Sequence, residues 1–110
     1  MRAITIGTNG EYAVTELKNG RQSIKETVGG EIEGLTFAGH TDLIMFLNET
    51  GRIFGLETNA KASVFALEFV REIDFLHGDV VVCGLDDEGA SCDLTDEQVK
   101  KFMQILDGID

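Results

Sequence analysis

The chain has 110 residues, of which 43% are hydrophobic, so it is long and apolar enough for one domain, residues 1–110, with a buried core. Its net charge of −11 opposes direct contact with nucleic-acid phosphates and with anionic lipid. The sequence shows no apolar run of about 20 residues and no signal-peptide pattern, so we expect a protein of the cytoplasm that does not contact a membrane.

The N-terminal part of the chain predicts a hairpin followed by a helix. Apolar and polar residues alternate over 2–6 and over 12–17, with an Asn-Gly turn between the two segments, which is typical of paired strands. A short helix is expected over 19–27, with Asn19 as its N-cap. Gly29 and the glycine that follows it would end this helix, because glycine adopts the left-handed conformation without a Cβ clash.

The middle of the chain predicts three strands and a second helix. A strand is expected over 31–37, and the continuous apolar run 43–47 favours a central strand. A four-residue turn ending in glycine follows this run, so we expect the chain to return as another strand over 52–56. The segment 59–69 predicts a helix, with apolar residues at helical spacing at Val64, Leu67 and Val70.

The C-terminal part predicts a buried strand, a tight turn and an amphipathic helix. The β-branched run 80–83 favours a strand that is buried on both faces. The sequence Asp-Asp-Glu-Gly at 86–89 is typical of a hairpin turn. Thr95 and Gln98 have the spacing of a capping box, in which the threonine hydroxyl and the glutamine side chain satisfy backbone N–H groups reciprocally.

These elements together predict an α+β fold. The short spacing between strands favours hairpins, so we expect a mainly antiparallel sheet of five or six strands. Two or three helices should pack on one face of the sheet, among them the C-terminal amphipathic helix.

The acidic stretch around 84–97 raises the question of a metal site. A calcium loop needs an acidic residue at its first position and a glutamate at its twelfth, and with Gly89 in the sixth position neither end fits. The turn and the helix cap account for most of these carboxylates, and we predict no metal ligands. Asp86, Asp87 and Glu88 remain candidates for contact with a basic protein partner.

Two cysteines and two histidines are the other candidates for chemistry. Cys83 and Cys92 flank the acidic turn and would face each other if the turn is centred on its middle pair, whereas a one-residue slip would place them on opposite faces. Whether they are paired stays open, although a reducing compartment favours free thiols. His40 is expected in a loop and His77 in a turn between a helix and a strand.

No nucleophile–base arrangement and no phosphate-binding loop appears in the sequence, so we predict no catalytic residue and no cofactor. A small-molecule pocket is an open alternative. Its candidate lining residues are Arg52, Asn59, Lys61 and His77, which are polar and lie in or beside predicted loops.

Several glycine-based motifs occur in a fixed order along nearly the whole chain. They are MRAI at the start, VGGEIE, LNETGRIFGLETNAKAS, HGDVVVCG and a final LTDEQ. In this order they resemble a family of small proteins from bacteriophages and mobile elements, known as domain of unknown function thirty-eight forty-six. Members often carry a proline after the Gly-Leu pair, where this chain has Glu57. The resemblance implies an accessory protein in a bacterial cytoplasm and brings no established activity or cofactor.

Three functional hypotheses follow. The first is a non-enzymatic accessory binding protein that acts on a host or phage protein, with a homodimer as an open possibility. The second is an acidic mimic of DNA that inhibits a DNA-binding enzyme, which the net charge of −11 motivates. The third is a protein that binds or sequesters a nucleotide or another small molecule.

Overall fold

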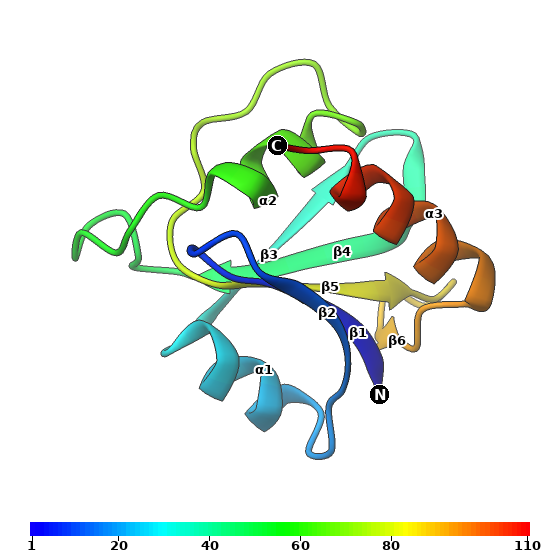
Figure 1. The fold of residues 1–110 in the computed structure, drawn as a ribbon. Coiled ribbons are helices and arrows are strands. Elements are labelled where there is room, and N and C mark those ends of the chain that lie inside the picture. The colour runs from blue at the N-terminus through cyan, green and yellow to red at the C-terminus, as the bar shows by residue number, and fades with distance from the viewer.

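Six strands form one antiparallel sheet, and three helices pack against it (Figure 1). The computed structural model describes residues 1–110. The sheet order is β2-β1-β5-β4-β3, and β6 pairs with β5 beyond the end of β1. In chain order the elements are β1 (Arg2–Ile6), β2 (Tyr12–Glu16), α1 (Arg21–Val28), β3 (Ile32–Phe37), β4 (His40–Asn48), α2 (Ala60–Ala66), β5 (Val80–Leu85), β6 (Ser91–Cys92) and α3 (Asp96–Asp107).

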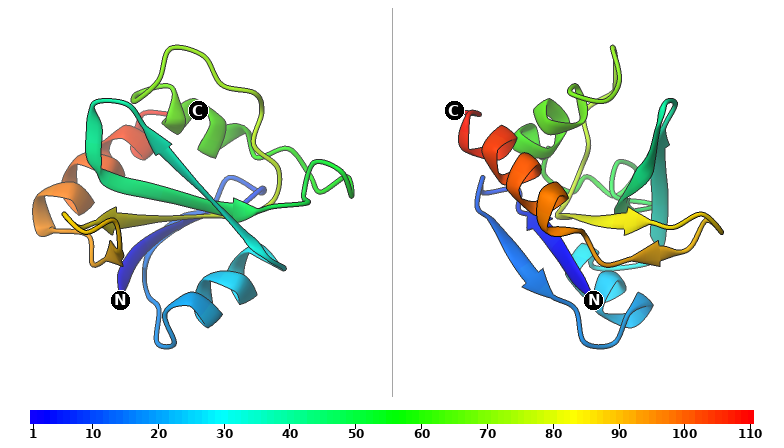
Figure 2. Two further views of the ribbon diagram at one scale, coloured as in Figure 1. Left: turned by 180° about the vertical axis from the view of Figure 1, so that it is seen from behind. Right: turned by 90° about the vertical axis from the view of Figure 1, so that its right-hand side faces the viewer.

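The predicted α+β class and the antiparallel sheet are confirmed. The Cα radius of gyration is 12.7 Å, close to the value of about 13 Å for a compact domain of this length. Helices α2 and α3 lie on one face of the sheet, as expected, and α1 lies on the opposite face (Figures 1 and 2). None of the helices has the length and the apolar character that crossing a membrane requires.

The central strand β5 explains why both faces of the sheet are covered. Val80 and Val82 point into the larger core beneath α2 and α3, whereas Val81 and Cys83 belong to the smaller core beneath α1. All four residues are fully buried, so neither face of β5 can be left in water. Strands with this continuous apolar pattern need a cover on each side.

The N-terminal elements follow the predicted hairpin and helix, with one correction. Strands β1 and β2 pair antiparallel as the predicted hairpin, and Ile24 and Val28 of α1 are buried against the sheet. Gly29 ends α1 in the left-handed conformation with φ of 82°. The prediction that Asn19 caps α1 is wrong, because the N-cap is Gly20 and no side chain accepts a hydrogen bond there.

The predicted return strand over 52–56 is wrong. β4 pairs with β3 on one side and with β5 on the other, so a hairpin returning from β4 would find no free edge. The chain instead leaves the sheet and coils through tight turns, in which Phe54 N–H donates to the Thr50 carbonyl at 3.0 Å and Leu56 N–H to the Gly51 carbonyl at 2.8 Å. This produces a projecting loop, residues 49–58, before α2.

Helix α2 begins where predicted, but it ends earlier and buries a different face. Asn59 is its N-cap, and the helix stops at Ala66. Val64 and Leu67, which the apolar spacing had suggested as the core stripe, are 45% and 49% exposed. Phe65 and Phe69 are buried instead and pack edge to face at a centroid distance of 5.2 Å, because the aromatic rings fill the larger core.

Two histidines lie in other surroundings than predicted. His40 begins β4 directly after a tight turn at Gly39, and it does not lie in a loop. His77 follows an irregular segment and not a helix, and it forms an isolated bridge with Thr58. This bridge ties the end of the projecting loop to the segment that leads into β5.

Candidate functional site

The acidic hairpin turn is built largely from its own hydrogen bonds. One carboxylate oxygen of Asp86 accepts from the backbone N–H groups of Glu88 and Ala90, each at 2.9 Å, and Gly89 adopts φ of 81°. The predicted turn is confirmed. Asp87 and Glu88 are exposed and take part in none of the ion pairs of the chain. Asp87 and Glu88 therefore stay candidates for contact with a protein partner.

The acidic residues after the turn hold the N-terminus and begin α3. Asp93 accepts a hydrogen bond from the backbone N–H of Arg2 at 2.8 Å, and Asp96 pairs with the Arg2 guanidinium at 2.7 Å. The predicted capping box is present, with Thr95 Oγ1 accepting from Gln98 N–H at 3.1 Å and Gln98 Oε1 accepting from Thr95 N–H at 2.9 Å. The structure brings no three His, Cys, Asp or Glu side chains together as a metal site.

The two cysteines lie on opposite faces of the sheet. Cys92 is opposite Gly84, one position beyond Cys83, and both thiols are free. This offset requires glycine at 84, because a Cβ there would lie 2.7 Å from the Asp93 carbonyl oxygen. Burial raises the pKa of Cys83 to about 12 and also raises the pKa of Cys92, so both thiols are protonated near neutral pH and are poor nucleophiles.

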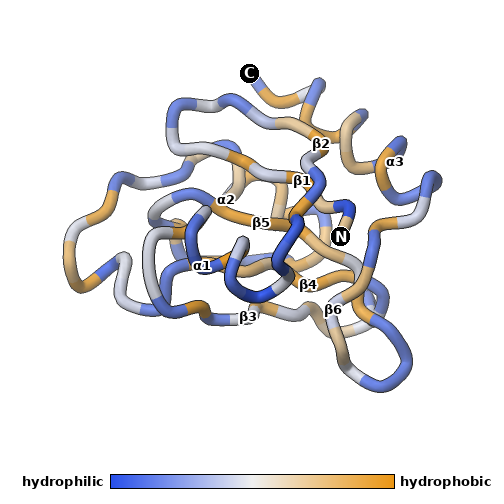
Figure 3. Tube along the Cα trace, turned by 90° about the horizontal axis from the view of Figure 1, so that it is seen from below, coloured by the Kyte–Doolittle hydropathy of each residue, from blue (hydrophilic) through white to orange (hydrophobic).

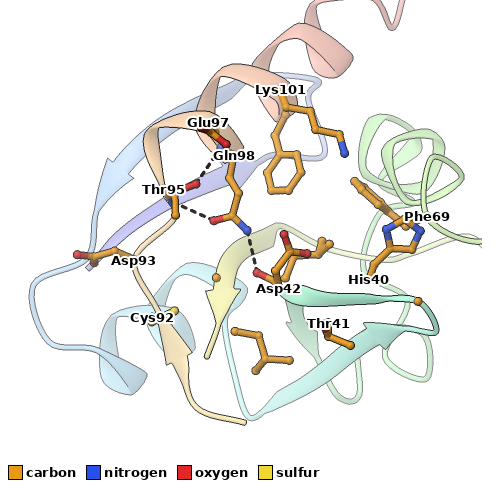
Figure 4. A pocket seen from close by; sticks show the side chains of 15 residues that line it. His40, Thr41, Asp42, Phe69, Cys92, Asp93, Thr95, Glu97, Gln98 and Lys101 are labelled. Atoms are coloured by element: carbon orange, nitrogen blue, oxygen red, sulfur yellow. Dashed lines mark hydrogen bonds between the residues drawn. The ribbon is translucent and has the colours of Figure 1, made fainter. Parts of the chain in front are cut away.

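A groove of about 720 Å³ lies between the first half of α3 and the sheet (Figure 4). Gln98 Nε2 donates to the Asp42 carbonyl at 2.8 Å, which ties α3 to β4 across the groove. Figure 4 shows Lys101 and His40 beside Phe69; the ammonium lies 6.0 Å and the imidazole 5.3 Å from the centre of its ring. The other two side-chain hydrogen bonds of this groove form the capping box between Thr95 and Gln98, and none of the three joins a nucleophile to a base.

The four predicted pocket residues do not form one site. Asn59 is fully buried, where its Nδ2 donates to the Ile6 and Gly78 carbonyls at 2.9 and 3.0 Å and its Oδ1 accepts from Ala62 N–H at 3.0 Å. Lys61 lies 4.8 Å above the ring of Tyr12 and donates to the Ile109 carbonyl at 3.3 Å. These contacts give both side chains structural roles, and neither residue lines the hollow that holds the other two candidates.

Arg52 and His77 do come together, in a smaller hollow of about 260 Å³ that we call the edge hollow. It lies beside the edge strand β3, between the start of the projecting loop and the segment 73–77. His77 Nδ1 is 3.0 Å from the Leu56 carbonyl. The other lining residues are Glu33, Leu35, Leu47, Asn48, Glu49, Ile73, Asp74, Phe75 and Leu76.

Next to this hollow, three large apolar side chains lie open to water. Ile53 is 80% exposed, Phe54 77% and Phe75 63%; we call these three residues the two-loop surface. Arg52 and Asp74, their immediate neighbours in sequence, form an ion pair at 3.3 Å that joins the two loops. In Figure 3 the projecting loop carries an apolar stretch at its tip, at the end of the molecule away from the acidic turn.

Sequence reasoning missed the two-loop surface because it placed Ile53 and Phe54 in a strand of the sheet. One signal could have exposed the error. The segment 52–56 contains a glycine, Gly55, which the structure shows at φ of 72°, a conformation that does not occur inside a regular strand.

One known family matches nearly the whole chain. Residues 1–107 match the family described as Domain of unknown function (DUF3846). No match to the chain was found among curated proteins or among solved structures. The family match includes every strand, both loops of the two-loop surface and the whole of α3. It agrees with the resemblance carried by the glycine-based motifs, and the chain therefore belongs to the DUF3846 family.

Proposed function

We propose that the protein is a non-enzymatic accessory protein that binds another protein through the two-loop surface. The observation that carries this proposal is the exposure of Ile53, Phe54 and Phe75 at one end of the sheet. Isolated exposed apolar residues are ordinary, but large apolar side chains gathered on two joined loops favour an interaction site. Phenylalanine is among the residues enriched at protein interfaces.

The charge of the chain favours a partner with a basic surface. With a net charge of −11 and acidic residues Glu49, Glu57 and Asp74 on the two loops, the surface favours a partner with an apolar centre and a basic rim. The resemblance to phage and mobile-element proteins suggests a host or phage protein in the bacterial cytoplasm as that partner. An acidic mimic of DNA is less well supported, because Asp86, Asp93 and Asp96 hold the turn and the N-terminus in place.

The test is a double substitution at the tip of the projecting loop. The wild-type protein is used to capture its partner from host cytoplasm, and the complex is then reconstituted from purified components. Ile53→Ser/Phe54→Ser should weaken binding by about 30-fold or more, which corresponds to the loss of a hot spot of about 2 kcal/mol. Isothermal titration calorimetry measures the affinity.

A matched control separates the surface from general apolar exposure. Val14 on β2 is 43% exposed and lies outside the two loops, so Val14→Ser should leave the affinity within about twofold. Unchanged binding by the loop variant, or equal loss from both variants, would contradict the proposal. Both variants should retain the unfolding free energy of the wild type within about 0.5 kcal/mol, since they change exposed residues.

A further inference from the structure

We infer that the edge hollow receives one lysine or arginine side chain of the protein partner. The inference rests on the proposed function, because the hollow lies directly beside the two-loop surface and shares Phe75 with it. It goes further by assigning a chemical identity to one group of the partner.

The volume of the hollow favours one side chain over a larger ligand. Its volume of about 260 Å³ is below the range of about 300–1,000 Å³ that is typical of small-molecule pockets. The larger groove beneath α3, at about 720 Å³, lies at the other end of the sheet and is lined by different residues. A ligand as large as a nucleotide would therefore fit the edge hollow poorly, whereas one long side chain can enter it.

The lining of the hollow is apolar in its buried part. Leu47 and Leu76 are 8% and 7% exposed, and Leu35 and Ile73 are half-buried against the same core. Lysine and arginine carry an aliphatic stem that packs on apolar surface while the charged head stays near water. A hollow with this floor therefore suits the stem of a basic side chain.

The charged groups around the hollow favour a positive head group. Glu33, Glu49 and Asp74 line it, against Arg52 and His77. Glu33 and Glu49 take part in none of the ion pairs of the chain, so their carboxylates are free to accept from a guanidinium or an ammonium. An acidic side chain or a phosphate would face three carboxylates against one guanidinium and one imidazole, and a neutral side chain would leave the exposed Glu33 and Glu49 in water without gaining a charged hydrogen bond.

The one ion pair at the hollow is easily exchanged. Arg52 and Asp74 are 63% and 82% exposed at a separation of 3.3 Å, and exposed pairs of this kind contribute only about 0–1 kcal/mol. A basic side chain from the partner can therefore take over Asp74 at little cost, and Arg52 can turn to solvent.

Three short peptides probe the inference directly. They share the sequence Gly-Leu-Xaa-Leu-Gly with both ends blocked, and Xaa is arginine, norleucine or glutamate. Each is titrated into the isotope-labelled full-length protein, and backbone amide shifts are followed by NMR. The arginine peptide should shift the amides of Leu35, Leu47, Ile73 and Leu76 and bind about tenfold more tightly than the norleucine peptide, and the glutamate peptide should cause no shift at these positions.

A charge-matched pair of variants separates the hollow from the overall negative charge. Glu33→Gln/Glu49→Gln and Asp87→Asn/Glu88→Gln each remove two exposed carboxylates, the first at the hollow and the second at the opposite end of the sheet. The first should weaken the arginine peptide by about tenfold, and the second should leave it within about twofold. Equal losses, equal affinity for arginine and norleucine, or shifts centred on the acidic turn would overturn the inference.

The same variants distinguish this inference from the proposed function. If binding of the reconstituted partner depends on Ile53 and Phe54 but is unchanged in Glu33→Gln/Glu49→Gln, the protein-binding function holds and the basic side chain is excluded. If the loop variant binds the partner normally, the proposed function fails whatever the peptides show.

Discussion

The two ends of the sheet differ in how their conspicuous residues are used. At one end, the acidic turn and the start of α3 concentrate carboxylates, of which Asp86, Asp93 and Asp96 accept hydrogen bonds from backbone or pair with Arg2. At the other end, the projecting loop and the segment 73–77 place large apolar side chains in water. The first end attracts attention in the sequence, and the second does so only in the structure.

This difference shows that a cluster of polar side chains is a poor indication of a binding site when those side chains make hydrogen bonds to the backbone. Asp86 and Thr95 are occupied by the turn and the helix cap that they create. Ile53 and Phe54 have no such internal role, because they are mostly exposed. Exposed apolar area without a structural use is the stronger indication of a partner.

The largest expected effect is a loss of unfolding free energy when the buried side-chain amide of Asn59 is removed. Asn59→Ala deletes the N-cap of α2 and leaves the Ile6 and Gly78 carbonyls without this donor. A lost cap costs about 1 kcal/mol, and each buried group that loses its partner costs about 1–3 kcal/mol. We expect a loss of about 3 kcal/mol in unfolding free energy, measured by urea denaturation followed by circular dichroism.

Asn19 supplies the control for this experiment. It was also predicted to cap a helix, but it is exposed and its side chain makes no hydrogen bond at α1. Asn19→Ala should therefore change the unfolding free energy by less than about 0.5 kcal/mol. Similar losses in the two variants would show that Asn59 does not anchor the apolar end.

The second prediction concerns Cys83 in β5, the strand that joins the two ends. Its pKa is raised from 9.0 to about 12 in the folded protein by burial, so the folded state keeps the proton while the unfolded chain releases it above about pH 9. Stability contributed by the neutral thiol is therefore full at neutral pH and is lost as pH rises, by about 1.4 kcal/mol per pH unit between these two values.

This loss is measured as a difference between two proteins. Urea unfolding of the wild type and of Cys83→Ala at pH 7.5 and pH 10.5 should show the stability advantage of the wild type falling by about 2 kcal/mol across this interval. The alanine variant keeps Tyr12 and Cys92, whose raised pKa values both proteins share, so their contributions cancel in the difference. An advantage that is constant with pH would mean that the acidic end opens and admits water to Cys83.

Local signals predicted most of the fold, and the largest failure has a long-range origin. The hairpin at 2–16, the helix end at Gly29 and the capping box at Thr95 each depend on neighbouring residues, which a sequence displays directly. The strand predicted over 52–56 failed because strand formation needs a free edge. One edge of β4 is occupied by the preceding strand β3 and the other by β5, which lies far away in the chain.

The candidate site could be predicted much less well. Arg52 and His77 were predicted for one pocket and do share the edge hollow, but Glu33, Glu49 and Asp74 come to it from three separate segments. No spacing rule links such residues, because their approach depends on how the loops cross the edge of the sheet. The acidic turn, in contrast, was predicted correctly because all its contacts lie within a few residues.

The smallest expected effect tests whether geometry or charge holds the acidic end. Asp86→Ala removes the acceptor of two exposed backbone N–H bonds and should cost about 1 kcal/mol, or roughly 4–8 °C in melting temperature, since water replaces part of the loss. Asp86→Asn keeps an oxygen acceptor without the charge and should stay near the wild type. Asp87→Ala removes a charge and no backbone hydrogen bond, so its melting temperature should also be unchanged. If the melting temperature of Asp86→Asn falls as far as that of Asp86→Ala, negative charge and not turn geometry stabilises this end. Its carboxylates would then have a structural role and would not be free to contact a partner.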